Sequence, residues 1–214
     1  MKTVIQSIIV FGGLAIMSSP LSAQNVPDQT PARKPGLWDM VTTGTVGPNQ
    51  LKAIKKYCLD ADADQALRQL HVLRMQLEVI YHDINCRAPE IAANRNVITG
   101  EMVCRTNSQE DSEAAGKDFH WKATFASDSD VVLEERSTPR DVMLLLEIAT
   151  TERQRWVGQC PAGMKPGDSL DLGFTYNSDA WPNQANADNI YASVERLEKA
   201  LDEGKMMNER LGPM

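Results

Sequence analysis

Four cysteines constrain the fold of this 214-residue chain more than any other feature of its sequence. They are Cys58, Cys86, Cys104 and Cys160, and their spacing contains no C-x-x-C pair and resembles no zinc site. An even number of cysteines in an exported chain is typical of a disulfide framework. We therefore expect two disulfides, for which three pairings are available.

One pairing fits the local sequence. Asn94-Arg95-Asn96 is a turn candidate, and Cys86 and Cys104 lie nine places either side of Arg95. A hairpin centred there places the two cysteines opposite each other, within the ~4.4–6.8 Å Cα separation that a disulfide requires. We therefore predict a Cys86–Cys104 disulfide and, by elimination, a Cys58–Cys160 disulfide.

The first 23 residues have the pattern of a cleavable secretory signal. Lys2 precedes an apolar run from Ile8 to Met17, and small and turn-forming residues lead up to Ala23. This run is shorter than the ~20 residues that span a bilayer, so we expect no stable membrane anchor after cleavage. A buried N-terminal helix is the alternative interpretation. An exported, disulfide-bonded protein of this kind is expected in the periplasm.

The mature chain is acidic. Cleavage after Ala23 leaves 191 residues, enough for one domain with appendages, and changes the net charge from −7 to −8. The densest basic group, Lys52, Lys55 and Lys56, fits a solvated strand edge. Without a basic cluster the chain is not expected to bind nucleic acid or anionic lipid.

Alternating apolar residues and turn signals predict a β-rich α+β fold, an antiparallel sheet or partial barrel with one inserted helix and a C-terminal helix. We expect a linker at 24–36, a disulfide-bonded β-rich domain at 37–170, and a loop with an amphipathic helix at 171–214. The predicted strands cover residues 37–45, 51–59, 79–86, 97–105, 119–126, 131–137 and, as the final strand, 150–157. Pro139 should break the chain, 142–148 is ambiguous between helix and strand, and 162–187 resembles a loop. Trp38, Trp121 and Trp156 are expected to face inward from three strands.

Two helices are indicated by apolar residues at helical spacing. The inserted helix is expected over about Ala63 to Leu77, with Asp62 and Gln65 in a capping arrangement. The terminal helix is expected from about Asp188 to Glu203 and should end at Gly204. Its apolar stripe consists of Ile190, Val194, Leu197 and Leu201. Such a stripe must be covered by the domain's own sheet, by a second copy of the chain or by another envelope protein, and we favour a partner over docking on the domain itself.

Candidate metal and catalytic residues do not form a recognisable site. Asp60, Asp62 and Asp64 imitate the start of a calcium loop, but its sixth and twelfth places hold Gln65 and His71 instead of Gly and Glu. The three histidines, His71, His82 and His120, lie at no ligand spacing to one another. No G-x-S-x-G, H-E-x-x-H or phosphate-binding loop occurs. We expect no catalytic residue, metal or cofactor.

Several short motifs carry a family likeness. Pro35-Gly36-Leu37-Trp38 opens the first strand, three spaced cysteines follow, and Arg155 to Pro161 and Lys165 to Asp168 close the pattern. Together they resemble the bacterial domain-of-unknown-function family numbered 3617, over about residues 34–168. The resemblance implies a periplasmic protein of a Gram-negative bacterium with no established activity. The inserted helix and the helical tail are not part of the pattern.

These features favour a non-catalytic binding module. A curved antiparallel sheet with tryptophans on its faces forms a natural pocket for a small apolar ligand, and the terminal helix could contact a protein partner. An unrecognised periplasmic hydrolase is the alternative, and a structural stabiliser of a larger envelope complex is a third hypothesis.

Overall fold

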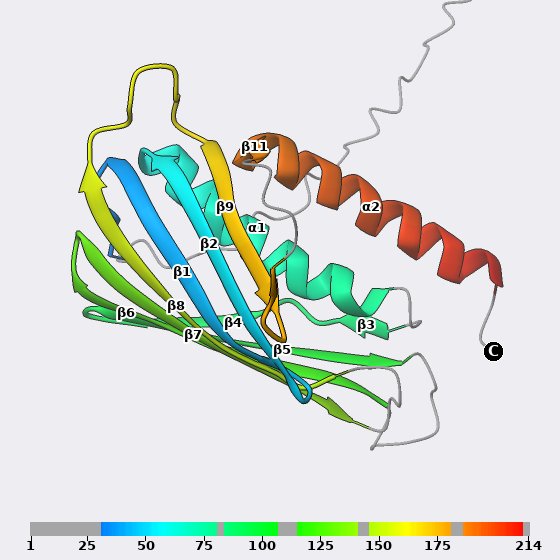
Figure 1. The fold of residues 1–214 in the computed structure, drawn as a ribbon. Helices are drawn as coiled ribbons and strands as arrows, with labels where there is room; N and C mark the ends of the chain where they lie inside the picture. Colours follow the sequence, from blue (N-terminus) through cyan, green and yellow to red (C-terminus); the bar gives the residue numbers. More distant parts are fainter. Residues whose placement is uncertain (1–30, 81–83, 107–114, 141–145, 181–185, 212–214) are drawn as a thin grey trace, which may run out of the picture.

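The computed structural model describes residues 31–80, 84–106, 115–140, 146–180 and 186–211, and it confirms a β-rich antiparallel fold with an inserted helix and a C-terminal helix (Figure 1). The expected secretory leader lies outside the described residues. In chain order the elements are β1 (Gly36–Val46), β2 (Asn49–Leu59), α1 (Ala61–Ile80), β3 (Ile84–Cys86), β4 (Glu90–Asn94), β5 (Val97–Thr106), β6 (Gly116–Ser127), β7 (Asp130–Arg140), β8 (Ile148–Gly158), β9 (Asp168–Tyr176), β10 (Asp179–Ala180), β11 (Asn186–Asn189) and α2 (Ile190–Leu211).

The strands form one antiparallel sheet that does not close into a barrel. Its order is β10-β9-β2-β1-β8-β7-β6-β5-β3, with β11 paired to β9 and β4 paired to β5. The sheet curves strongly, and α1 lies against its concave side while α2 runs beside α1 (Figure 1). The core therefore lies between the inner face of the sheet and one helix.

Helix α1 begins where Asp60 caps it, because the Ala63 amide donates a hydrogen bond of 2.8 Å to Asp60 Oδ1. The expected arrangement of Asp62 with Gln65 is therefore not the cap. The helix also continues to Ile80, beyond the expected end at Leu77. Val79 and Ile80, which we expected to open a strand, are its last buried residues. A short apolar run does not distinguish the two periods, and here the helix continues through it.

The two disulfides of the structure join Cys58 to Cys160 and Cys86 to Cys104. The turn between β4 and β5 is centred between Arg95 and Asn96, because Asn94 pairs with Val97. A regular hairpin with that centre would place Cys86 opposite Arg105. Residues 87–89 interrupt the strand and shift the register by one, so that Cys86 pairs with Cys104 instead.

The C-terminal helix docks on α1, which corrects the expectation of an external cover. Ile190 and Leu201 of its apolar stripe are buried, and Leu201 packs in a cluster with Leu73 and Ile80 of α1. Gly204 does not end the helix. A Cβ atom there would lie 2.9 Å from Ile80 Cγ1, so glycine allows the two helices to approach closely.

Two further expectations are wrong. Strand β9 lies within the expected loop at 162–187, pairs with β2, and crosses the boundary expected after residue 170. Pro139 stays within β7, opposite Lys117. The expected linker at 24–36 is ordered at its end, where Arg33 is buried. Most of the ambiguous segment 142–148 lies outside the described residues, and its last residue begins β8.

The tryptophans follow the expected inward pattern to different degrees. Trp38 and Trp121 are buried, whereas Trp156 pairs with Trp38 across β1 and β8 and is half-buried against the same core. Gly100 makes room for Trp121, because a Cβ atom at that position would lie 2.0 Å from the indole ring. The indole ring of Trp121 can therefore lie across the inner face of the neighbouring strand.

Docking of α2 makes a stability prediction. Leu201→Ala should lower the free energy of unfolding by about 2–5 kcal/mol, because it leaves a cavity between α2 and α1. The control Lys199→Ala, at a side chain that is 77% exposed on the same helix, should change it by less than about 0.5 kcal/mol. Urea unfolding of the mature protein measures both. Equal stability of the two variants would contradict the docked position.

Candidate functional site

A partly enclosed cavity of about 810 Å³ lies between α1 and the inner face of the sheet. Helix α1 contributes side chains from Gln65 to Glu78, and strands β1, β2 and β4 to β8 contribute the opposite walls. The cavity exists because the sheet is wider than the single helix that packs on it. A smaller pocket of about 80 Å³ lies beside Ile80 and Leu201.

Most of the cavity wall is apolar. It combines flexible and aromatic side chains from both layers, with methionines that adapt to irregular shapes. The apolar residues are Met40, Leu67, Val72, Leu73, Met75, Ile91, Ile98, Trp121, Ala123, Phe125, Leu133, Ile148 and Leu201. Such a wall suits the hydrocarbon part of a ligand.

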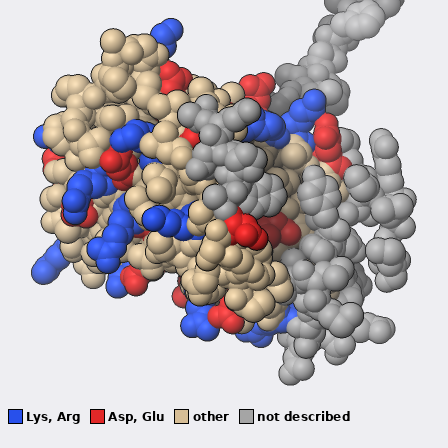
Figure 2. Space-filling model, in the orientation of Figure 1, with Lys and Arg blue, Asp and Glu red and all other residues tan. Residues whose placement is uncertain are grey.

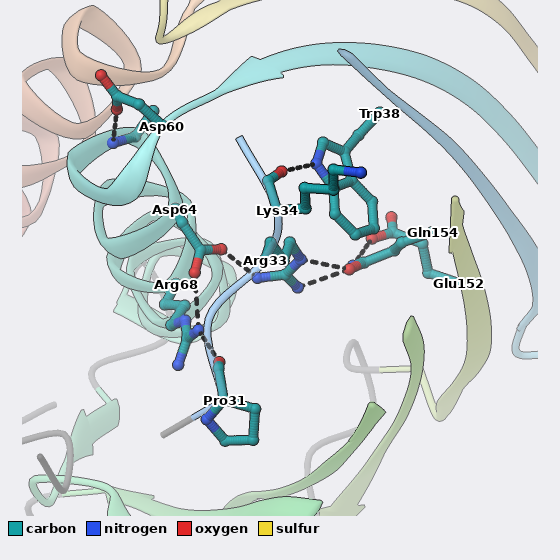
Figure 3. A network of polar contacts seen from close by, with 10 residues as sticks. Pro31, Arg33, Lys34, Trp38, Asp60, Asp64, Arg68, Glu152 and Gln154 are labelled. Atoms are coloured by element: carbon teal, nitrogen blue, oxygen red, sulfur yellow. Dashed lines mark hydrogen bonds and ion pairs between the residues drawn. The ribbon is translucent and has the colours of Figure 1, made fainter. Parts of the chain in front are cut away.

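A buried arginine closes the end of the cavity at which α1 begins (Figure 3). Arg33 forms an ion pair with Asp64 of α1, and its Nε and Nη2 donate hydrogen bonds of 2.8 and 2.6 Å to Gln154 Oε1 of β8. Arg68 holds the other Asp64 oxygen at 2.7 Å and also donates to the Pro31 carbonyl. The network thus connects the N-terminal segment, the helix and the sheet.

The two arginines of this network stabilise the ionised form of Asp64. Burial by itself would raise the pKa of the Asp64 carboxyl, but Arg33 and Arg68 outweigh burial and hold the pKa below its ordinary value. Both guanidinium groups also lie near the Phe125 ring, at 5.6 and 5.9 Å from its centroid. Asp64 therefore stays ionised in the folded protein.

The segment that carries Arg33 is held against the sheet by two indoles. Trp38 Nε1 donates to the Lys34 carbonyl at 2.9 Å, and Trp156 Nε1 donates to the Pro35 carbonyl at 3.0 Å. The Lys34 ammonium lies 3.9 Å from the centroid of the Trp156 ring, a cation–π contact. These contacts hold the segment so that Arg33 reaches the cavity wall, where it meets Asp64 and Gln154 (Figure 3).

A second polar group lies farther along the wall. Arg74 of α1 donates a hydrogen bond to the Tyr57 hydroxyl of β2, and burial raises the pKa of Tyr57 although Lys55 and Arg74 act to lower it. Nearby, Glu152 accepts hydrogen bonds of 2.7 Å from Thr42 and 2.6 Å from Gln154. The polar groups on this side of the cavity are thus largely engaged with one another.

A third polar group contains the histidine of α1. His71 Nε2 lies 3.9 Å from Glu135 Oε2 of β7, too far for a hydrogen bond, and this buried atom has no hydrogen-bond partner among the described residues. The imidazole meets the Trp121 ring edge-on, with centroids 5.9 Å apart. His71 Nε2, beside Glu135, is thus an atom of the cavity wall with unused hydrogen-bonding capacity.

The possible metal ligands that the sequence offered have separate structural roles where the structure describes them. Asp60 caps α1, Asp62 is exposed and Asp64 belongs to the arginine network, so these aspartates do not converge on a calcium ion. His120 lies exposed beside Glu101, and His82 falls outside the described residues. Within the described ranges, no three His, Cys, Asp or Glu residues are arranged to hold a metal ion.

Sequence reasoning missed Arg33 and Arg74, and it assigned Glu135 to a solvated face together with Glu134. Arg33 stands in a proline-rich stretch that resembles a linker, and no local pattern marks it as buried. Glu135 follows Glu134 in β7, and strand alternation turns one of the two inward. That alternation is the signal that could have identified Glu135.

Charged residues of both signs are scattered over the exterior face seen in Figure 2. On the face drawn in Figure 2, Lys and Arg lie interspersed with Asp and Glu. Neither helix, over the part that is described, is long and apolar enough to cross a membrane.

Comparison with known proteins gives one match. The family model described as "Protein of unknown function (DUF3617)" matches residues 33–160, which begins at Arg33, spans α1 and ends at Cys160. The motif at Lys165 to Asp168 and helix α2 lie beyond the matched range. No curated protein and no solved structure gives a significant match.

The arginine network predicts an acid-sensitive contribution to stability. Asp64→Asn should lower the free energy of unfolding by about 3–5 kcal/mol near neutral pH, because it leaves two guanidinium groups without their carboxylate. The control Asp62→Asn changes an exposed carboxylate in the same turn and should cost less than about 0.5 kcal/mol. Urea unfolding measures both.

The pH dependence has a defined sign. Because the folded-state pKa of Asp64 lies below the ordinary 3.8, its contribution is complete above that pH and is lost as the pH falls through the folded-state value. The difference in stability between wild type and Asp64→Asn should therefore shrink in acid. A difference that is constant from pH 7 to about pH 2 would contradict the buried ion pair.

Proposed function

This chain belongs to the family described as "Protein of unknown function (DUF3617)", a description that assigns no activity, and we propose that it is an exported, non-catalytic protein that binds a small, largely apolar ligand in the cavity between α1 and the sheet. The observation that carries this proposal is the cavity itself. Its volume of about 810 Å³ lies within the ~300–1,000 Å³ of small-molecule sites.

The energetics of the wall support a hydrocarbon ligand. Each methylene group that leaves water for such a wall contributes about 0.8 kcal/mol, so a chain of eight to ten carbons would contribute about 6–8 kcal/mol before the cost of association. Met40, Met75 and Leu133 line this space from both layers. Their side chains can adapt to ligands of different shape.

The surroundings of the cavity support a preformed site. The Cys58–Cys160 disulfide ties the end of β2 to the segment after β8, and these two strands flank β1. The Arg33–Asp64 ion pair holds α1 relative to the sheet at one end. A ligand that enters the cavity would meet walls that the disulfide and the ion pair already hold in place, which lowers the entropic cost of ordering those walls on binding.

Export rests on the sequence. The leader up to Ala23 and the use of all four cysteines in disulfides suit an oxidising compartment, and we propose the periplasm of a Gram-negative bacterium.

The cavity predicts binding of a neutral apolar probe. N-phenylnaphthylamine should bind the mature protein with enhanced fluorescence, and Ala123→Trp should weaken binding at least ~10-fold because the indole occupies the space that the probe needs. The matched control is Ala126→Trp at an exposed position of the same strand, which should bind like wild type. Equal binding by the two variants, both folded by circular dichroism, would place the probe elsewhere and contradict the proposal.

Export predicts a defined mature protein. Expressed with its own leader in a Gram-negative host, the chain should accumulate in the periplasmic fraction, begin at or near Gln24 and contain no free thiol. Cell fractionation followed by intact-mass measurement before and after thiol alkylation tests all three. A cytoplasmic product that retains Met1 and alkylates at four cysteines would contradict export.

A further inference from the structure

The cavity wall contains a buried polar atom with which a ligand can make a hydrogen bond that the described residues leave unmade. His71 Nε2 and Glu135 Oε2 are 3.9 Å apart, and both side chains face the cavity with about a fifth of their surface exposed. Nε2 is buried and without a partner among the described residues. A buried polar atom left in this state costs about 1–3 kcal/mol, so a ligand group that satisfies it gains affinity.

A single ligand oxygen suits the gap. Two atoms 3.9 Å apart can each lie at hydrogen-bonding distance from one oxygen placed between them. A hydroxyl group meets both requirements, because its hydrogen can be donated to the Glu135 carboxylate while its oxygen accepts a hydrogen bond from His71 Nε2–H. An ether oxygen could meet only the second, and a carboxylate would be repelled by Glu135.

The hydrogen-bonding geometry and the cost of desolvation favour a neutral hydroxyl group over an ammonium. Arg33 and Arg68 share Asp64, and Lys55 pairs with Asp171 at 2.8 Å. Five carboxylates and four cations line the cavity, so a carboxylate ligand would add to an excess of negative charge. An ammonium has no lone pair with which to accept a hydrogen bond from His71 Nε2–H, and a ligand without net charge avoids the desolvation cost of an ion.

Trp121 adds an apolar support beside this pair. Its ring contacts the His71 imidazole edge-on and also lines the cavity, so it restricts the imidazole to an orientation next to Glu135. The hydrocarbon part of a ligand anchored here would extend along the apolar wall formed by Ile98 and Leu133. The polar anchor and the apolar wall are therefore contiguous.

We propose that the ligand is a neutral, hydroxyl-bearing amphiphile whose hydroxyl group bridges His71 Nε2 and Glu135 Oε2 while its hydrocarbon part fills the apolar wall. This specificity rests on the proposed cavity-binding function and adds a ligand class to it.

The test compares matched competitors against N-phenylnaphthylamine bound to the wild-type mature protein. Decanol should displace the probe at a concentration at least ~10-fold lower than decyl methyl ether does, a difference of about 1.4 kcal/mol. Decylammonium and decanoate should both be weaker than decanol. Equal displacement by decanol and its ether, or stronger displacement by decylammonium, would overturn the hydroxyl assignment and leave cavity binding intact. No binding of the probe at all would instead defeat the proposed function.

A variant pair tests the residues. His71→Leu with Glu135→Leu should retain probe binding but lose the preference for decanol over the ether. The matched control is His120→Leu with Glu101→Leu, a histidine–glutamate pair 3.5 Å apart on the exposed surface, which should keep the preference. If the folded His71→Leu, Glu135→Leu variant still prefers decanol over the ether, the hydroxyl assignment is contradicted. If that variant does not fold, the competitor series on the wild-type protein decides the assignment.

Discussion

The fold depends on the packing of α1 against a sheet that does not close. An open antiparallel sheet with an apolar concave face is unstable in water unless another element covers that face. Helix α1 supplies the cover, and α2 in turn covers α1 through Leu201 and Ile80. Because one helix is narrower than the sheet, the cover is incomplete, and the remaining space is the cavity.

Besides apolar packing, the buried side chain of Arg33 joins the helix to the sheet by electrostatic contacts. Arg33 would be costly to bury alone, and Asp64 together with Gln154 compensates it by approaching from opposite layers. A network of this kind contributes little net stability relative to an apolar core, but it defines one position of the helix on the sheet. The family match begins at Arg33, a residue that precedes the first strand.

Much of the architecture follows from local sequence, whereas the site does not. Alternation identifies β1 and β2, and helical spacing identifies both helices, because these signals act over a few residues. Strand β9 was missed because Gly173 and the surrounding turn-forming residues conceal its alternation. The pairing of His71 with Glu135 depends on where α1 crosses the sheet, which no local pattern contains. Likewise, no local pattern shows that α1 covers the apolar stripe of α2.

The claim that a ligand occupies the space between α1 and the sheet is tested most directly by methyl NMR. Mature protein labelled at isoleucine, leucine and valine methyl groups would be titrated with decanol. We expect the largest shifts at Ile98 and Leu133, which line the cavity, and little change at Leu146 and Val157, which are exposed. Shifts confined to Leu146 and Val157, with Ile98 and Leu133 unchanged, would contradict binding in the cavity.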